Sequence, residues 1–430
     1  MKEKISLFWF RRDLSTADNI GLCRALSSGF PVLPLFIFDP GILLALESRY
    51  DRRVDYIQQA LHQINYEFKA FGSSLYTFYG TPLSVFEDLA EKYAIQAVFC
   101  NHDEEPQAIA RDNAVAAFFS RQEIPFRSYK NQVIFERNDI LKQDGKPYTV
   151  FTPYAKKWKA QFAQISIQPE TPDFGQLFRQ PFKEVHSLAD LGFNKTDILF
   201  VRPQLPAATI SRYAAYRDYP ALQQTTQLGM ALRFGTISIR TCVSFAWPEH
   251  LAWLNELIWR EFFMQILYHF PQVTRQAFHA KYERLRWRNN EQEFEKWCEG
   301  KTGYPLVDAG MRQLNATGYM HNRVRMITAG FLCKHLLIDW RWGEAYFAKK
   351  LNDYDLAANN GNWQWAAGTG CDAAPYFRIF NPLTQAEKFD KKQEYIKKWL
   401  PEWGTAAYPE QIVAHAFARE RALKTYREIE

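Results

Sequence analysis

The fold is decided by two stretches of the sequence, Ala316-Thr-Gly-Tyr-Met-His-Asn-Arg-Val-Arg-Met326 and Asp353-Tyr-Asp-Leu-Ala-Ala-Asn-Asn-Gly-Asn-Trp-Gln-Trp365. In a helix the first stretch places Asn322, Arg325 and Met326 on one face, because residues three and four apart are neighbours there. An amide, a guanidinium and a thioether together suit a ligand better than a hydrophobic core. The alternative is an ordinary helix end with a solvated arginine and a buried methionine.

The second stretch is dense in polar groups. Asp353 and Asp355 lie one residue apart in a loop-like segment, and the adjacent amides Asn359 and Asn360 and two tryptophans follow. Polar groups packed between apolar helices need partners, and a large polar cofactor is one way to supply them. A capped helix start is the other interpretation of the same residues.

Composition and charge bound the class of protein. The chain has 430 residues, 47% hydrophobic and 23% charged, which is typical of a soluble globular protein with two domains. No apolar run suits a membrane span, and strand-like residues stand where a signal peptide would, so we expect a cytoplasmic protein. The six cysteines are scattered singly, which predicts no metal site. Residues 201–430 carry a net charge of +7 and residues 1–200 a net charge of −1, so a surface for a polyanion belongs to the second half.

The first part of the chain predicts an α/β domain. Helical patterns separate four short apolar runs, at residues 5–10, 32–38, 74–78 and 97–100. Continuous apolar strands of this kind indicate a parallel sheet buried on both faces. We therefore expect a Rossmann-like domain at residues 1–130, although no G-x-G-x-x-G follows its first strand. A long connector at residues 131–200 and an all-helical domain at residues 201–430 complete the predicted organisation.

Two more groups of residues in the helical part suit ligands. Thr225-Thr-Gln-Leu-Gly229 offers hydroxyls and N–H groups near a helix start, which suit a pyrophosphate, although threonine is also a routine helix cap. Further along, Glu256, Trp259 and Arg260 present an acceptor, a flat ring and a cation on one helix face. This trio suits a base displaced from a duplex, whereas a tryptophan on a helix is more commonly a core residue.

Together these residues resemble the photolyase/cryptochrome flavoproteins, and most of all the microbial class I cyclobutane pyrimidine dimer photolyases. The resemblance runs from Phe8-Trp-Phe-Arg-Arg-Asp-Leu14 to His415-Ala-Phe-Ala-Arg-Glu-Arg-Ala-Leu423, almost the whole chain. It implies an α/β domain that can hold an antenna chromophore, a connector, and a helical domain that binds FAD and DNA. The flavin-phosphate loop departs from the family pattern, because Thr226 and Gly229 replace its serines.

The resemblance implies the residues that bind the cofactor. FAD, reduced and anionic when active, would be bound by Tyr213, Thr225, Thr226, Gln227, Leu228, Gly229, Arg260, Asn322, Arg325, Asp353, Tyr354, Asp355 and Asn359. Asn359 would face flavin N5, where an amide can form a hydrogen bond without being a ready proton donor. Trp287, Trp340 and Trp363 match the chain of indoles that carries electrons from the protein surface to the flavin.

UV-damaged DNA is the implied partner. The residues that match its contacts are Arg217, Glu256, Trp259, Arg260, Asn322, Arg323, Met326, Trp365 and Arg378. Arginines would contact phosphates, and Glu256, Trp259, Met326 and Trp365 would line the pocket for the flipped-out dimer. We expect a monomer with no membrane and no obligate protein partner.

A second chromophore stays open at the sequence level. Glu105 matches a carboxylate that contacts a folate pterin in some family members, so methenyltetrahydrofolate or a deazaflavin could act as an antenna. The crevice could equally be empty. In that case the acidic residues up to Glu105 would simply favour the start of the next helix through its dipole.

The implied function is light-driven DNA repair, in which photoexcited reduced FAD gives an electron to a cyclobutane pyrimidine dimer and so splits it. Such a carbon–carbon lyase needs a reductant rather than a nucleophile, and the chain has no G-x-S-x-G, H-E-x-x-H or Walker loop. The alternative is a cryptochrome-type blue-light photoreceptor without repair activity, which the amide Asn359 and Met326 oppose. Repair of 6-4 photoproducts and a plain flavin oxidoreductase are less well matched.

Overall fold

The computed structural model describes residues 2–429, which divide by their contacts into two compact units. The first unit holds the segment that ends at Asp139, together with Ala160–Leu205 and Leu228–Glu249. The second unit holds Ile140–Lys159, Pro206–Gln227 and the segment from His250 onward. Among the described residues, no helix is both long and apolar enough to cross a membrane.

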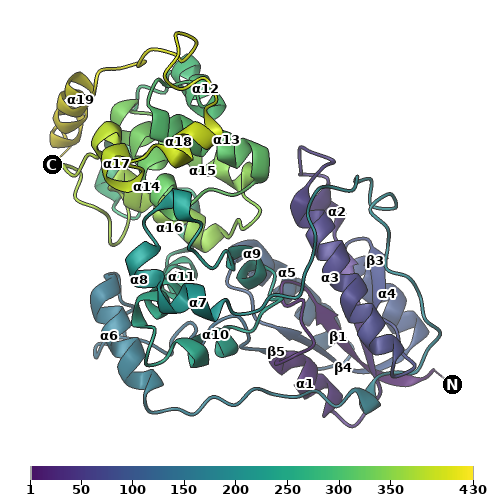
Figure 1. The fold of residues 1–430 in the computed structure, drawn as a ribbon. Helices are drawn as coiled ribbons and strands as arrows, with labels where there is room; N and C mark the ends of the chain where they lie inside the picture. The colour runs from purple at the N-terminus through teal and green to yellow at the C-terminus, as the bar shows by residue number, and fades with distance from the viewer. Residues whose placement is uncertain (1, 430) are drawn as a thin grey trace. The chain divides into compact units, whose positions relative to one another are not determined.

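The first unit is built on a five-stranded parallel sheet with the order β3-β2-β1-β4-β5 (Figure 1). The strands are β1 (Lys4–Phe10), β2 (Val32–Phe38), β3 (Tyr76–Tyr79), β4 (Ala94–Asn101) and β5 (Phe126–Tyr129). The expected Rossmann-like parallel sheet is thereby confirmed. No pattern in the sequence predicts β5, a four-residue strand with no buried side chain that pairs only with β4 in the sheet.

Both faces of this sheet are covered by helices. Phe8 and Phe10 of β1 belong to one buried cluster with α1 (Ile20–Leu26) and α3 (Arg52–Lys69), whereas Leu7 and Trp9 belong to another with α4 (Pro82–Lys92) and α5 (Pro106–Ser120). Side chains thus alternate between two apolar layers, which is why the strands appear in the sequence as unbroken hydrophobic runs. The helices of this unit are α1 (Ile20–Leu26), α2 (Pro40–Leu43), α3 (Arg52–Lys69), α4 (Pro82–Lys92), α5 (Pro106–Ser120), η1 (Phe174–Gln176), α9 (Gly229–Arg233) and α10 (Ile239–Ala246).

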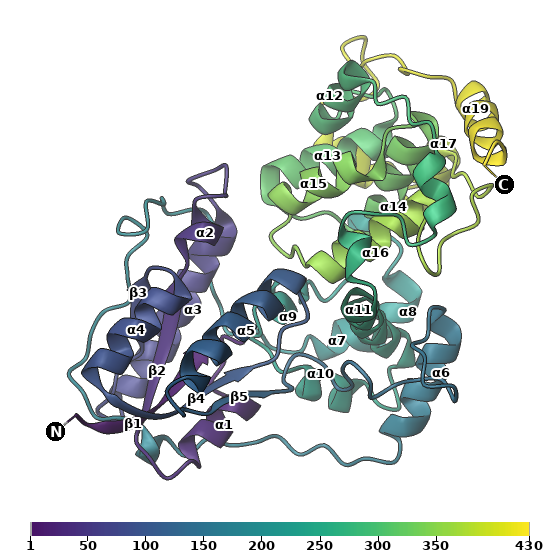
Figure 2. The ribbon, with the colours of Figure 1, turned by 180° about the vertical axis from the view of Figure 1, so that it is seen from behind.

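The second unit contains helices and no strand among its described residues, as the sequence predicts (Figure 2). It includes the start of α6 (Phe151–Phe162), then α7 (Ala207–Ser211), α8 (Tyr213–Tyr216), η2 (Pro220–Leu222), α11 (Leu251–His269), η3 (Pro271–Thr274), η4 (Ala280–Arg284) and α12 (Glu291–Glu299). It continues with α13 (Pro305–Thr317), α14 (Asn322–Gly330), the π-helix η5 (Phe331–His335), α15 (Trp340–Lys350), α16 (Leu356–Ala367), α17 (Pro382–Phe389), α18 (Glu394–Trp399) and α19 (His415–Arg427).

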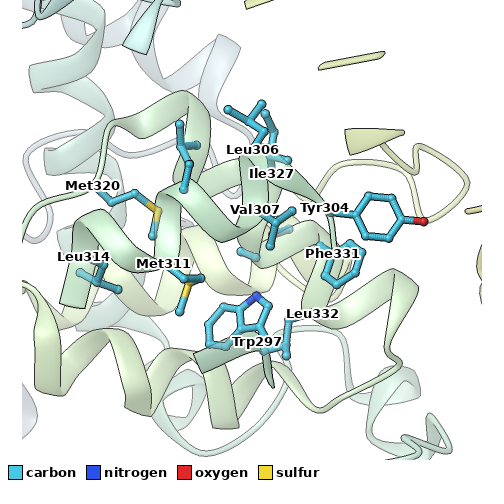
Figure 3. Packing of buried hydrophobic residues seen from close by; sticks show 14 of the residues in the cluster. Trp297, Tyr304, Leu306, Val307, Met311, Leu314, Met320, Ile327, Phe331 and Leu332 are labelled. Atoms are coloured by element: carbon cyan, nitrogen blue, oxygen red, sulfur yellow. The ribbon is translucent and has the colours of Figure 1, made fainter. Parts of the chain in front are cut away.

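The core of the helical unit surrounds Trp297 of α12. This indole lies with Met311, Leu314 and Leu332 in one buried cluster (Figure 3). Its Nε1 donates a hydrogen bond to the carbonyl oxygen of Thr328 at 3.1 Å, so its polar atom is satisfied inside the core. The cluster joins α12, α13, α14 and η5, and it fixes the helix on which the first decisive stretch of sequence lies.

Acid should weaken this unit through a buried histidine. His335 is 1% exposed, and its Nε2 lies 2.9 Å from Nδ1 of His415. Burial, with smaller effects of His415 and Arg421, lowers the pKa of His335 to about 3. The unfolded chain takes up a proton here near pH 6.5, whereas the folded chain does not. Stability is therefore lost as the pH falls below about 6.5, by roughly 2 kcal/mol at pH 5 from this group.

The prediction is checked by urea unfolding at pH 7 and pH 5. We expect His335→Gln to lose less free energy of unfolding between these two values than the unchanged protein, because the group that titrates only in the unfolded state is gone. The unchanged protein, measured at the same two pH values, is the control. Equal losses in His335→Gln and the unchanged protein would contradict the assignment.

Candidate functional site

The start of α14 places the first group of polar side chains. Gly318 ends α13 in a left-handed conformation, and Nδ1 of His321 caps α14 by accepting the N–H of Arg323 at 3.1 Å. Burial lowers the pKa of His321 to about 4, so the ring is neutral at pH 7 and its Nδ1 is free to accept. This cap aims the face of α14 that carries Asn322 and Met326 at the pocket described below.

Arg325 joins α14 to the segment before α16. Its Nη2 donates to the two carboxylate oxygens of Asp353 at 2.9 and 3.1 Å, and its Nε donates to the carbonyl oxygen of Met320 at 2.7 Å. Burial alone would lower the pKa of Arg325, but the charge and hydrogen bonds of Asp353 outweigh it and raise that pKa. The guanidinium therefore stays charged, and it is held by three hydrogen bonds.

The two adjacent amides of α16 face different partners. Nδ2 of Asn359 donates to Oε1 of Glu344 on α15 at 2.8 Å and to the carbonyl oxygen of the same residue at 3.1 Å. Asn360 instead donates to the carbonyl oxygen of Val273 at 2.9 Å, as does Gln364 at 3.0 Å. Asn360 and Gln364 thus anchor the turn after α11, and only Asn359 reaches the pocket.

These elements enclose a pocket inside the helical unit. The pocket is open on one side, and its empty space together with the open solvent at its mouth is about 590 Å³. Nine residues that the sequence analysis singles out line it together: Asn322, Arg325, Met326, Asp353, Tyr354, Asp355, Asn359, Trp363 and Trp365. Further lining residues are Ala329, Phe347, Leu351, Ala358, Asn362 and Ala366. The walls combine apolar rings with donors and acceptors, as in sites for flat polar cofactors.

Glu344 is a residue of this site that the sequence analysis misses. Burial raises the pKa of its carboxyl, although the hydrogen bond from Asn359 acts in the opposite direction. A single glutamate on α15 carries no sequence signal, because its partner Asn359 lies fifteen residues away on another helix.

A second cavity of the same unit lies beside the Thr225 loop. It is lined by Thr225, Gln227, Tyr319 and His321, and the hydroxyl oxygens of Thr225 and Tyr319 are 3.2 Å apart. The ring of His321 also lies within hydrogen-bond reach of the backbone of Arg217. Of the other predicted phosphate-loop residues, Gly229 begins α9 and Leu228 precedes it. Tyr213 lies on α8, and burial, followed by Glu256, raises its pKa.

Glu256 and Trp259 of α11, both predicted to bind the pyrimidine dimer, have partners within the chain. Glu256 forms an ion pair with Arg217, and burial raises the pKa of Glu256 despite that cation. The ring of Trp259 is stacked on that of Phe151, with centroids 3.6 Å apart. Arg323 pairs with Asp218 at 2.7 Å, next to Arg217 in the sequence.

Two more arginines are predicted to contact DNA. Arg260 is partly exposed on α11, and Arg378 is exposed in the loop after α16.

The three predicted relay tryptophans differ in burial. Trp363 is 2% exposed and Trp340 1% exposed, whereas Trp287 is partly exposed. Trp363 packs against Gly343 of α15, where an added Cβ would lie 2.1 Å from the indole. The guanidinium of Arg341 lies 4.8 Å from the ring centre of Trp340.

Glu105 in the first unit is engaged by two arginines. Its Oε1 accepts a hydrogen bond from Arg12 at 2.7 Å, and it also pairs with Arg233 of α9. Its side chain does not cap α5, although its neighbour Asp103 accepts the backbone N–H of Glu105 at 3.1 Å. The carboxylate therefore already has cationic partners within the chain.

Comparison with known families gives two matches that together cover most of the chain. Residues 6–173 match the model of the DNA photolyase family, and residues 253–407 match the FAD binding domain of DNA photolyase. A deoxyribodipyrimidine photo-lyase of Synechococcus sp. is 36% identical over 98% of this chain and 96% of its own length.

Solved structures agree with these matches. A bacterial class III photolyase from Agrobacterium tumefaciens superposes with a TM-score of 0.87 at 30% identity, over 100% of this chain and 98% of that one. An archaeal photolyase from Sulfolobus tokodaii, solved with two FAD molecules, gives 0.85 at 33% identity over 98% and 99%. A cryptochrome from Synechocystis sp. also gives 0.85, over 100% of both chains, but at 24% identity, so it shows the shared fold alone.

The close contact between α15 and α16 gives a prediction about stability. Gly343→Ala should lower the free energy of unfolding by about 1–3 kcal/mol, because the new methyl group overlaps the indole of Trp363 and forces it to move. Thermal unfolding of the FAD-free protein would measure the effect.

Gly330→Ala is the matched control. It is also a helical glycine, but its added Cβ would meet only Phe380, at 3.9 Å. This variant should be neutral or more stable, by up to about 1 kcal/mol, because alanine favours a helix over glycine. Equal stability of the two variants would contradict the packing described for Trp363.

Proposed function

The chain belongs to the DNA photolyase family, and we propose that it uses light and bound FAD to split cyclobutane pyrimidine dimers in UV-damaged DNA. The observation that supports this function best is the pocket where Asn322, Arg325 and Met326 of α14 meet Asp353 and Asn359. Its mixture of charge, amides and aromatic walls suits a flavin. The enzyme is thus a carbon–carbon lyase driven by electron transfer rather than by a nucleophile.

The residues of the helical unit fit FAD. Asp353, Tyr354, Asp355, Asn322 and Asn359 would bind its flavin and ribityl parts. The hydroxyls of Thr225 and Tyr319 and the amide of Gln227 give the second cavity polar groups that suit a ligand. Of the predicted phosphate-binding residues, Tyr213, Thr225, Thr226, Gln227 and Arg260 belong to this unit and would interact with the phosphates, whereas Leu228 and Gly229 belong to the first unit.

When bound and reduced, FAD supplies the electron that weakens the ring bonds of the dimer on illumination. Arg325 offsets negative charge in the pocket, because its own pKa is raised and it stays protonated. Nδ2 of Asn359 donates to both the carbonyl oxygen and Oε1 of Glu344, so its amide oxygen would be left for the flavin, as an acceptor that gives no proton. This arrangement favours the anionic reduced cofactor.

Trp363, Trp340 and Trp287 would carry electrons to the flavin. Their burial supports this order, because the first two are inside the core and the third reaches the surface. The role of each indole is to lose an electron and regain it, so the protein contributes position and electrostatics rather than proton transfer.

Damaged DNA would bind to the helical unit. Arg217, Arg260, Arg323 and Arg378 would contact phosphates. Arg217 suits this role because it holds Glu256 and still leaves 37% of its own side chain exposed.

The dimer would leave the duplex, at a cost of a few kcal/mol, and enter the pocket. Its pyrimidines would be bound by Glu256, Trp259, Asn322, Met326 and Trp365.

The cysteines bear on the compartment in which the protein acts. The six free cysteines agree with a reducing compartment, and we infer a monomer that acts in the cytoplasm without an obligate protein partner.

An antenna chromophore, methenyltetrahydrofolate or a deazaflavin, would bind to the α/β unit. Glu105 remains our proposed contact for it, although Arg12 and Arg233 already engage this carboxylate.

The function is tested by repair under controlled light. The protein is purified, reduced without oxygen and mixed with an oligothymidine that contains cyclobutane dimers, and the return of thymine absorbance is followed. We expect repair only when light and reduced FAD are both present, with a dark sample as the control. An absorption band in the near ultraviolet beyond that of FAD would reveal an antenna. A flavin that binds and is photoreduced while no thymine returns would contradict repair and favour a light sensor.

A further inference from the structure

The indole of Trp259 is stacked face to face on a phenylalanine that no sequence pattern marks. Phe151, the first residue of α6, lies with its ring centre 3.6 Å from that of Trp259, and the two planes differ by 5°. On α11 itself, Phe263 lies 5.4 Å from Trp259 at an angle of 29°. Trp259 is thus covered closely on one side, while its contact with Phe263 is looser and opens at an angle.

Phe151 is held by neighbours on other elements. Its backbone N–H donates to Oδ2 of Asp372 at 3.0 Å, and its ring meets the edge of Phe262 at 5.9 Å. The next turns of α6 are fixed to α11 as well, because Nε1 of Trp158 donates to the buried Glu261 at 2.5 Å. The phenyl ring is therefore held rigidly against α11 and is not a mobile side chain on the surface.

The geometry of the pair indicates what it is for. Aromatic pairs prefer an offset or edge-on arrangement to full overlap, so the parallel contact is imposed by the two helices rather than chosen by the rings. A fixed phenyl ring prevents the indole from turning about its side-chain bonds. A ring that is already immobile loses less conformational entropy when a ligand stacks on it or against its edge.

We propose that Phe151 is a positioning residue for damaged DNA: it holds Trp259 in the orientation that receives the displaced pyrimidines. This inference rests on the proposed role of Trp259 in binding the dimer. Phe151 acts only through Trp259, and it is not among the residues that line the cofactor pocket. Its loss should therefore change lesion affinity and leave FAD binding and affinity for undamaged DNA as they are.

The test begins with Phe151→Leu, which keeps the apolar volume but removes the flat ring. Dissociation constants are measured for a duplex with one cyclobutane dimer and for the same duplex undamaged. We expect the constant for damaged DNA to rise about two- to twelvefold, the range for freeing one immobilised side chain, while that for undamaged DNA is unchanged. The repair rate at saturating substrate should stay the same. Phe151→Tyr should keep the original affinity, because it keeps the ring.

Two comparisons separate positioning from general packing. Phe270→Leu makes the same change at the other end of α11, where the ring contacts Phe278, and should leave the preference for damaged DNA intact. In a Trp259→Ala background, Phe151→Leu should weaken lesion binding by less than about twofold, since a residue that acts through Trp259 has no effect once the indole is gone.

Several results would overturn the proposal. Tighter lesion binding by Phe151→Leu would mean that the phenyl ring covers the surface which the base needs. An unchanged preference for damaged DNA, or an equal loss for both duplexes, would make Phe151 a packing residue only. If both the Trp259→Ala and the Phe151→Leu proteins bind the lesion normally and still repair it in light, the inference fails while the proposed function stands. Absence of repair by the unchanged protein would be a failure of the function itself.

Discussion

The ion pair between Arg325 and Asp353 is the interaction on which the candidate site depends. It connects α14 to the loop that leads into α16, and these elements supply most of the pocket. Its side chains are 25% and 19% exposed, so the charges are shielded from most of the solvent. Removing one partner of such a pair costs more than the pair itself contributes, because the other charge is left without compensation. The position of Asp353, Asp355 and Asn359 relative to α14 thus depends on this contact.

Helix α16 is held in place by hydrogen bonds and close packing on the faces that point away from the pocket. Asn359 is bonded to α15, whereas Asn360 and Gln364 hold the turn after α11. Two glycines allow the helices to approach closely. A Cβ added at Gly343 would lie 2.1 Å from the ring of Trp363, and a Cβ added at Gly361 would lie 2.1 Å from the ring of Phe263. A helix fixed in this way keeps polar groups in place before any cofactor binds. Preorganised groups of this kind stabilise charge without first having to reorganise.

Most of the fold and much of the site could be predicted from local patterns. The apolar strands, the helical second half and the pocket residues of α14 and α16 each have a signal in the sequence, namely periodicity or dense polar groups. Contacts between side chains of different helices have no such signal. Glu344 of α15 meets Asn359 of the next helix, and Phe151 of α6 meets Trp259 of α11, only because these helices pack together. The edge strand β5 also has no such signal, because it is short and half polar.

The central claim is that the Arg325–Asp353 pair builds the FAD site, and FAD titration of the apoprotein tests it most directly. Dissociation constants are measured for the unchanged protein, Arg325→Met, Asp353→Asn and the double variant. The account predicts that each single change weakens binding at least about tenfold, and that the double variant is weakened by less than the two effects combined, since the two side chains act as one unit. Single variants that bind FAD as tightly as the unchanged protein would contradict the account.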